Sequence, residues 1–194
     1  MKQEHSNREN ILECAKQLFY EKGYDSVGVQ EIVDTAGITK PTMYYYFKSK
    51  QGLLQCLLQE GGTRILNAMR EAVQMEGEFM EVLQCVIRRY LSVAMEDREF
   101  YLMLMNLYFS ARETEGYKAA RPYIVQLLKL LQEFFERVAQ THTKIQGKEK
   151  FLSISLTGII NTYMLVVFEG DISDEMMEDP TIVTDIASQF AMYA

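Results

Sequence analysis

The sequence is poor in the residues that build metal sites and disulfide frameworks. Among 194 residues it has three cysteines, two histidines, three prolines and no tryptophan. Cys14, Cys56 and Cys85 are odd in number and widely spaced, with no Cys-x-x-Cys pair. This disfavours zinc or a disulfide framework and fits a reducing compartment. We therefore expect no metal and no cofactor, and a cytoplasmic location.

Features of the common enzyme classes are also missing. His5 and His142 stand in no His-Glu-x-x-His or Glu-x-x-His arrangement suited to metal ligation. No glycine-rich phosphate loop, nucleophile elbow or Cys–His pairing is evident. The acidic stretches at 113–115 and 171–179 are interpreted as solvated loops. We predict that the protein is not an enzyme.

Signals for a membrane are weak. The N-terminus, MKQEHSNREN, is polar and lacks the apolar run of a signal peptide. Residues 151–168 carry no charge over 18 positions, yet they include five Ser, Thr and Asn side chains and barely reach spanning length. A helix buried between protein partners is favoured over a membrane span, and no membrane partner is expected.

The charge is uneven along the chain. The formal net charge of −7 by itself disfavours nucleic acid, because phosphate binding depends on Lys and Arg. Residues 1–50 contain seven basic and seven acidic groups, whereas the remaining 144 hold thirteen and twenty. Lys40, Lys48 and Lys50 fall within eleven positions that contain no acidic residue. A local basic patch on an acidic protein is therefore predicted.

Apolar spacing indicates helices throughout, with no alternating strand pattern. The expected helices lie near 7–22, 29–35, 39–47, from 49 into the 60s or 70s, 78–95, 98–111, 117–140, 148–169 and 180–193. We predict an all-α fold of about nine helices. A compact three-helix domain over 1–50 is followed by a larger helical domain over 51–194.

Residues 23–50 have the pattern of a helix-turn-helix. The tight turn at 36–38 contains Gly37, which can adopt the positive φ that such a turn needs. Thr39 can cap the next helix, and Pro41 is tolerated in its first turn. Two short helices joined in this way can place the second helix in the DNA major groove.

The second of these helices has an inward and an outward side. Met43 and Phe47, four residues apart, face inward, and the outward side then exposes polar and aromatic groups. Tyrosine and threonine hydroxyls can bond phosphate oxygens. Lys40 and Lys50 can pair with phosphates, or Lys40 with a guanine edge. The outward residues are Lys40, Thr42, Tyr44, Tyr45 and Tyr46.

Two alternatives stay open within this segment. Neighbouring residues on a helix lie about 100° apart, so Tyr44, Tyr45 and Tyr46 cannot all face one way. Tyr45 either faces outward or packs inward against the first helix. Gln30, near the start of the preceding helix, either contacts the DNA backbone or is simply solvated.

The run from Ile11 to Leu54 resembles the N-terminal DNA-binding domain of the TetR family. The match covers about 44 residues with ordered spacing. Two positions depart from the pattern: Gly28 stands where the family usually has Thr or Ser, and Val33 where it favours Ala. The matching residues are Leu18-Phe19, Gly23-Tyr24, Ile32-Val33, Ala36-Gly37-Ile38, Thr42-Met43-Tyr44, Phe47 and Ser49-Lys50.

This resemblance implies a ligand-responsive repressor that binds a palindromic operator as a homodimer and is released by a small apolar or aromatic effector. Tyr44 matches a phosphate contact of the family. Whether the protein represses or activates stays open. The DNA-binding residues are expected to be Gln30, Thr39, Lys40, Pro41, Thr42, Tyr44, Tyr45, Tyr46 and Lys50.

The resemblance also implies that residues 51–194 hold the effector pocket and the dimer interface. The uncharged helix 151–168 and the segment 180–193 are the expected dimer-forming pair, with contacts from Gly158, Ile159, Tyr163 and Val166. Aromatic and methionine side chains suit an adaptable pocket, although such a stripe is also typical of plain core. The candidates are Phe100, Tyr101, Met103, Met105, Tyr108, Phe109, Arg112, Tyr117 and Tyr123.

The competing interpretation is a helical small-molecule carrier or adaptor that never contacts DNA. Its support is the net charge of −7. It leaves the lysines and tyrosines of residues 40–50 without a role.

Overall fold

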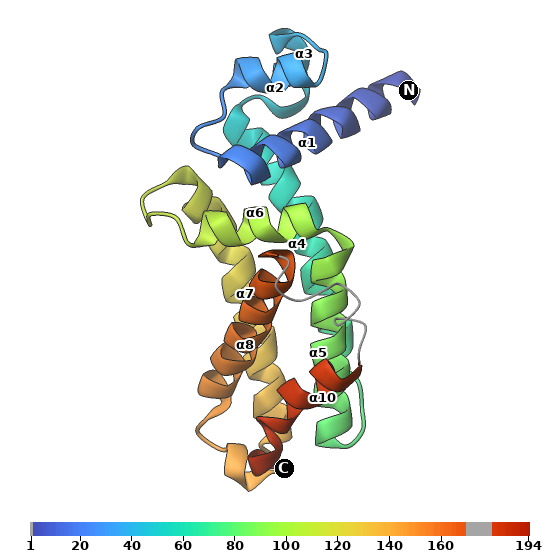
Figure 1. Ribbon diagram of the computed structural model, residues 1–194, viewed down its shortest axis with the longest axis vertical. Helices are drawn as coiled ribbons and strands as arrows, with labels where there is room; N and C mark the ends of the chain where they lie inside the picture. The colour runs from blue at the N-terminus through green and yellow to red at the C-terminus, as the bar shows by residue number, and fades with distance from the viewer. Residues whose placement is uncertain (1, 170–179) are drawn as a thin grey trace. The chain divides into compact units, whose positions relative to one another are not determined.

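The computed structural model describes residues 2–169 and 180–194 (Figure 1). Within these ranges the chain forms nine α-helices and no strand, which confirms the predicted all-α fold. The helices are α1 (Lys2–Lys22), α2 (Val29–Thr35), α3 (Lys40–Phe47), α4 (Lys50–Val73), α5 (Phe79–Glu96), α6 (Arg98–Tyr108), α7 (Glu115–Val138), α8 (Glu149–Glu169) and α10 (Pro180–Ser188), with the 3₁₀ turns η1 (Thr143–Ile145) and η2 (Ala191–Tyr193).

The chain divides into two compact units. The first consists of residues 1–64 and 97–124, and the second of residues 65–96 and 125–194. Helices α4 and α7 contribute to both. The predicted boundary between residues 50 and 51 falls in the first turn of α4, which runs on without a break. The functional division at that point therefore stays a prediction.

In the first unit, α1 packs along α6 and against α2. The apolar face of α1 is buried, with Ile11, Ala15 and Phe19 at most 1% exposed. Two adjacent glycines of α4 allow close approach of aromatic rings. A Cβ on Gly61 would lie 2.4 Å from the Phe100 ring of α6, and one on Gly62 would lie 2.4 Å from the ring of Tyr123.

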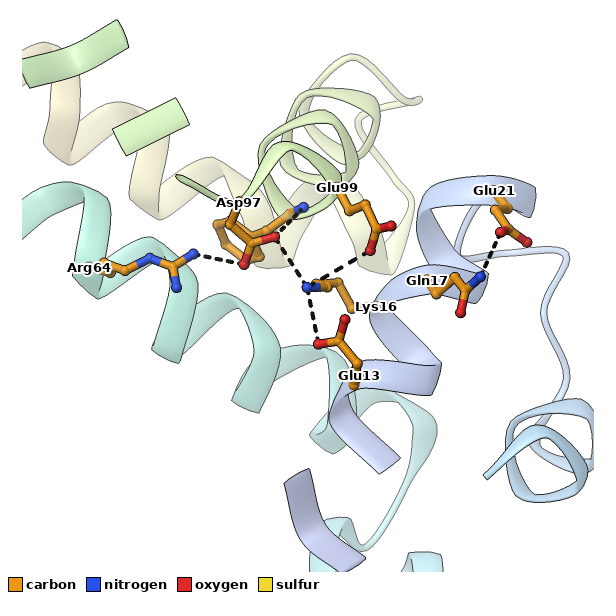
Figure 2. A network of polar contacts seen from close by, with 8 residues as sticks. Glu13, Lys16, Gln17, Glu21, Arg64, Asp97 and Glu99 are labelled. Carbon is orange, nitrogen blue, oxygen red and sulfur yellow. Dashed lines mark hydrogen bonds and ion pairs between the residues drawn. The ribbon is translucent and has the colours of Figure 1, made fainter. Parts of the chain in front are cut away.

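Asp97 joins three helices of this unit (Figure 2). It is the N-cap of α6, where its Oδ1 accepts a bond of 3.2 Å from the backbone N–H of Phe100. The same oxygen lies 3.2 Å from Nζ of Lys16 on α1. Its Oδ2 lies 2.8 Å from Nη2 of Arg64 on α4. One carboxylate thus holds the start of α6 against both α1 and α4.

The pKa values of Asp97 and Lys16 are shifted by burial and by the groups that they contact. Burial opposes ionisation of Asp97, but the bonds from Arg64, from the Phe100 N–H and from Lys16 outweigh it and hold the pKa of Asp97 below its ordinary value. Burial likewise opposes the charge on Lys16, yet its bonds and attraction to Glu13 and Asp97 raise the pKa of Lys16. Both groups are therefore more strongly ionised in the fold than in water.

In the second unit, α10 and α8 both pack on α5. The face that α10 turns inward is apolar, with Ile182, Ile186 and Ala187 buried. Between α5 and α8, the hydroxyl of Tyr90 donates to Oδ1 of Asn161 at 3.0 Å. A polar residue of the uncharged segment is thereby satisfied inside the unit.

Helix α8 is apolar on two sides. Leu156, Ile160 and Met164 are fully buried on one side, whereas Phe151 and Ile154 are 62% and 52% exposed on another. Over Glu149–Phe168 the helix is long and apolar enough to cross a membrane by length and composition alone, a test that core helices of soluble proteins also pass. The exposed stripe needs a separate explanation.

We expect Asp97→Asn to lower the free energy of unfolding at pH 7 by roughly 1–2 kcal/mol, because the amide keeps a capping oxygen but loses the charge. The folded pKa of Asp97 is depressed, so its contribution is complete above the unfolded pKa of about 3.9 and is lost as the pH falls through the folded pKa. The difference between variant and parent should therefore shrink below about pH 4.

Urea unfolding at pH 7 and at successively lower pH measures this difference. Asp25→Asn is the control, because Asp25 is exposed. A penalty for Asp97→Asn that stays constant down to the lowest pH would show that its ionisation does not stabilise the fold.

Candidate nucleic-acid interface

Helix α3 is held by two buried side chains. Met43 is 0% and Phe47 3% exposed, as their spacing predicts. The N-cap is Thr39, whose Oγ1 accepts from the backbone N–H of Thr42 at 3.4 Å, and Pro41 lies in the first turn. The Thr39 and Thr42 hydroxyls are also 2.9 Å apart. The cap and the inward face are those that the sequence indicates.

The outward side of α3 carries the predicted DNA-binding residues. Lys40 and Pro41 are exposed, and Thr42 is half-buried. Tyr45, for which the sequence leaves inward packing open, is 66% exposed, and Tyr44 is 42% exposed. Tyr46 is half-buried, and its ring packs edge-on against the Tyr45 ring, with the two ring centroids 5.1 Å apart. The outward face is thus centred on Tyr44 and Tyr45.

Lys48 is the C-cap of α3 and is not among the predicted DNA-binding residues. Its backbone has φ of +66°, a conformation that residues other than glycine rarely adopt. Its Nζ donates to the carbonyl of Tyr45 at 3.1 Å and lies 5.9 Å from the Tyr45 ring centroid. The cation therefore stands beside the most exposed tyrosine. Its place in the lysine cluster at 40–50 was the one signal that the sequence offered.

Lys50 faces the protein's own backbone. Its Nζ donates to the carbonyls of Tyr24 at 2.9 Å and Val27 at 3.0 Å. It also lies 4.1 Å from the Tyr24 ring centroid, within the range of a cation–π contact. Because its ammonium group has these three partners, Lys50 fixes the segment between α1 and α2. Its predicted phosphate contact stays a prediction.

Helix α2 and the turn after it follow the expected geometry. Gly37 has φ of +65°, and Nδ2 of Asn10 on α1 donates to the Ala36 carbonyl at 2.9 Å. Gly28 caps α2 without a side-chain bond, and Val33 is 2% exposed. Gln30 is exposed and donates to Oδ1 of Asp34 at 2.7 Å, so its side chain is held along α2.

The predicted effector residues do not share one environment. Phe100, Tyr101, Met103 and Met105 are at most 4% exposed, while Tyr108, Tyr117 and Tyr123 are half-buried. Phe109 is 72% exposed and Arg112 is exposed as well. The rings of Tyr108 and Tyr117 stack at 5.9 Å. Phe100 also lines a cavity of about 220 Å³ beside Lys16, Arg64 and Asp97.

The predicted dimer residues of α8 are exposed or half-buried. Gly158 is exposed, and a Cβ built on it would meet nothing within 4 Å. Ile159, Tyr163 and Val166 are half-buried. In the part of the chain that the structure describes, no group of three or more His, Cys, Asp and Glu side chains is arranged to hold a metal ion.

Residues 11–57 match the family model described as bacterial regulatory proteins, tetR family. This segment of the chain is therefore similar to the DNA-binding region of TetR-family regulators. The matched segment runs from the buried face of α1 into the first two turns of α4, and so contains α2, the turn at Gly37 and all of α3.

Curated HTH-type transcriptional regulators are similar to this chain over part of its length. The chain is 27% identical to the HTH-type transcriptional activator FasR of Mycolicibacterium smegmatis over 97 residues, which cover 50% of this chain and 44% of FasR. It is 37% identical to the HTH-type transcriptional repressor BdcR of Escherichia coli over 86 residues, which cover 42% of this chain and 44% of BdcR. The chain thus spans about half the length of these relatives.

The likeness in fold extends beyond this segment to nearly the full length of the chain. A TetR-like transcriptional regulator from Rhodococcus sp. RHA1 superposes with a TM-score of 0.74 and 19% identity, covering 97% of each chain. At that identity the likeness concerns the fold. The relatives named above are transcriptional regulators, not enzymes.

We predict that Lys50→Met lowers the free energy of unfolding by roughly 1–3 kcal/mol, because two bonds to backbone carbonyls are lost. Lys40→Met, at an exposed position of the same short segment, should change it by less than about 0.5 kcal/mol. Thermal or urea unfolding of the two variants makes the comparison. Equal stability of both variants would mean that the Lys50 contacts contribute nothing.

Proposed function

We propose that this chain is a DNA-binding transcriptional regulator that reads a palindromic operator as a homodimer. The observation that carries the proposal is the outward face of α3. It combines exposed Lys40, Tyr44 and Tyr45 with the cation of Lys48, on a helix anchored by Met43 and Phe47. The helix-turn-helix geometry is the one that inserts a second helix into the major groove.

The chemistry of this face suits a DNA backbone. Phenolic and threonine hydroxyls donate to phosphate oxygens, and lysine ammonium groups release counterions when they pair with phosphates. Gln30, Thr39, Pro41, Thr42, Tyr46 and Lys50 belong to the proposed interface as predicted from the sequence, and Lys48 is added to them. The carrier or adaptor alternative leaves this exposed cluster unexplained.

The charge distribution makes the proposed contact narrow. Residues 1–50 sum to zero and the remainder carries the whole −7. Attraction to phosphate therefore comes from a few lysines near α3. Such an interface should show a modest salt dependence, since the slope follows the number of phosphates neutralised.

We propose that the homodimer forms through the exposed stripe of α8. Phe151, Ile154 and Leu165 are 62%, 52% and 39% exposed, and they lie along the helix with Gly158 between them. A two-fold partner is the occupant that a palindromic operator requires, because its half-sites are related by the same symmetry. Gly158 permits close approach of the partner helix.

The remaining parts of the proposal follow from the family. An apolar or aromatic effector, contacting the α6–α7 residues between Phe100 and Tyr123, would lower operator affinity. Repression and activation both fit, since FasR is named an activator and BdcR a repressor. We propose a cytoplasmic, non-enzymatic protein without a membrane partner.

Selection of bound duplexes from a random-sequence pool tests the DNA-binding proposal. We expect enrichment of palindromes whose half-sites lie about one helical turn apart or a little more.

On the selected site, Lys48→Gln should weaken binding, because one ammonium–phosphate contact is lost. The slope of log affinity against log salt concentration (the salt slope) should fall by the equivalent of about one phosphate. Lys129→Gln, which removes an exposed lysine of the second unit, is the control and should leave both unchanged.

A pool without any enriched palindrome would favour the carrier or adaptor. Enrichment with an unaltered Lys48→Gln salt slope would instead remove Lys48 from the interface.

The dimer is tested separately by Ile154→Glu, which places a charge on the stripe at a position 52% exposed. We expect the folded protein to shift from dimer to monomer in sedimentation velocity at micromolar concentration, because a buried unpaired carboxylate is costly. Val125→Glu, at a position 42% exposed on α7, should leave the dimer intact. A dimer that survives Ile154→Glu would place the interface elsewhere.

A further inference from the structure

A cleft of about 510 Å³ lies in the second unit, where α4 and α7 both end. Its lining comes from residues 74–82, at the α4–α5 connection, and from residues 134–142, at the end of α7 and beyond. The volume is within the range of about 300–1,000 Å³ that small-molecule sites occupy. We call it the α4–α7 cleft. None of the predicted effector residues lines it.

The base of the cleft is aromatic. Phe79 and Phe134 are 4% and 1% exposed, and their ring centroids are 6.4 Å apart. The ring of His142 lies 5.3 Å from that of Phe79. Val82, 6% exposed, adds an aliphatic side chain. A flat apolar molecule can therefore contact rings and methyl groups that are already fixed by packing.

The formal charges in the cleft cancel. Arg137 and Glu76 carry its two formal charges, one positive and one negative, and His142 is the histidine of its lining. The guanidinium of Arg137 donates to the Val73 carbonyl at the end of α4 and lies 5.8 Å from the Phe134 ring. Among the described residues, neither Arg137 nor Glu76 takes part in an ion pair. Opposite charges in one cleft favour neither an anion nor a cation.

The rest of the rim offers neutral hydrogen-bonding groups. Gln74, Gln140 and Thr141 contribute amides and a hydroxyl. The Thr141 hydroxyl lies 2.9 Å from Nδ1 of His142. A few placed polar groups around an aromatic base are the usual composition of a small-molecule site.

We propose that the α4–α7 cleft binds an uncharged, flat aromatic molecule that bears a hydroxyl or amide group. Its ring packs beside the half-buried His142 ring and over the small exposed parts of Phe79 and Phe134, and its polar group bonds to the amide and hydroxyl groups of the rim. The inference concerns ligand binding by the free protein, so its test does not depend on whether the protein binds DNA.

Titration of the full chain with 2-naphthol, followed by calorimetry at pH 7, tests the proposal. We expect saturable binding at one site per chain. 2-Naphthoate and 2-naphthylmethylamine share the ring system but are charged at this pH, and should bind at least ten-fold more weakly. Equal or tighter binding of either charged compound would overturn the assigned ligand class, and absence of saturable binding by 2-naphthol would overturn the site.

Matched variants on α7 locate the binding. Val138 lines the cleft and is half-buried, so Val138→Phe fills part of it and should weaken 2-naphthol binding at least ten-fold. Val125→Phe makes the same exchange at an exposed position outside the cleft and should leave the affinity unchanged. Thr141→Phe, on the exposed rim, repeats the test at a position beyond the end of α7. Full affinity in a folded Val138→Phe or Thr141→Phe chain would place the ligand elsewhere.

Discussion

The burial of Met43 and Phe47 is the contact on which the orientation of α3 depends. A helix of eight residues has little stability of its own, because nucleation costs more than a few internal hydrogen bonds return. Its direction is therefore set by the side chains that it buries. The Phe47 ring also has the Arg8 guanidinium 5.8 Å from its centroid, and Arg8 bonds to Glu60 of α4 at 2.6 Å. Once this side is fixed, Tyr44 and Tyr45 must face outward.

The parts of this site that sequence predicts are those that neighbouring residues decide. The turn needs a positive φ at Gly37, the first turn of α3 needs the Thr39 cap, and the spacing of Met43 and Phe47 sets the inward side. Each depends on residues within one or two helical turns. The positive φ of Lys48 is local as well, but a lysine in a sequence does not predict a positive φ, whereas a glycine does.

The contacts of Lys50 are an example of what local sequence patterns do not predict. Its two carbonyl acceptors belong to Tyr24 and Val27, which lie 26 and 23 residues earlier in the chain. A lysine in a basic cluster looks like a phosphate ligand until these contacts are known. The same holds for Phe100 and Tyr123: their composition suggested a pocket, but their rings fill the space that Gly61 and Gly62 leave open. Aromatic content alone does not separate a cavity from the core.

Helix α8 presents the same difficulty in another form, because it has no charged side to mark its solvent face between Phe151 and Phe168. Several of its polar side chains satisfy themselves locally: the hydroxyls of Thr157 and Thr162 donate to the carbonyls of Ser153 and Gly158 at 2.8 and 2.9 Å. These two hydroxyls therefore need no hydrogen bond from water, and their positions do not indicate which side of α8 is exposed.

Only tertiary packing assigns the two faces of α8, by covering Leu156 and Ile160 while Phe151, Ile154 and Leu165 stay exposed. Single exposed apolar residues are ordinary on protein surfaces, but a continuous stripe along a helix is typical of an interface. A self-complementary stripe is also what a two-fold pair of reading helices needs to hold both at one palindrome. In the proposed dimer, a second copy of the chain covers the helix that by length and composition could also cross a membrane.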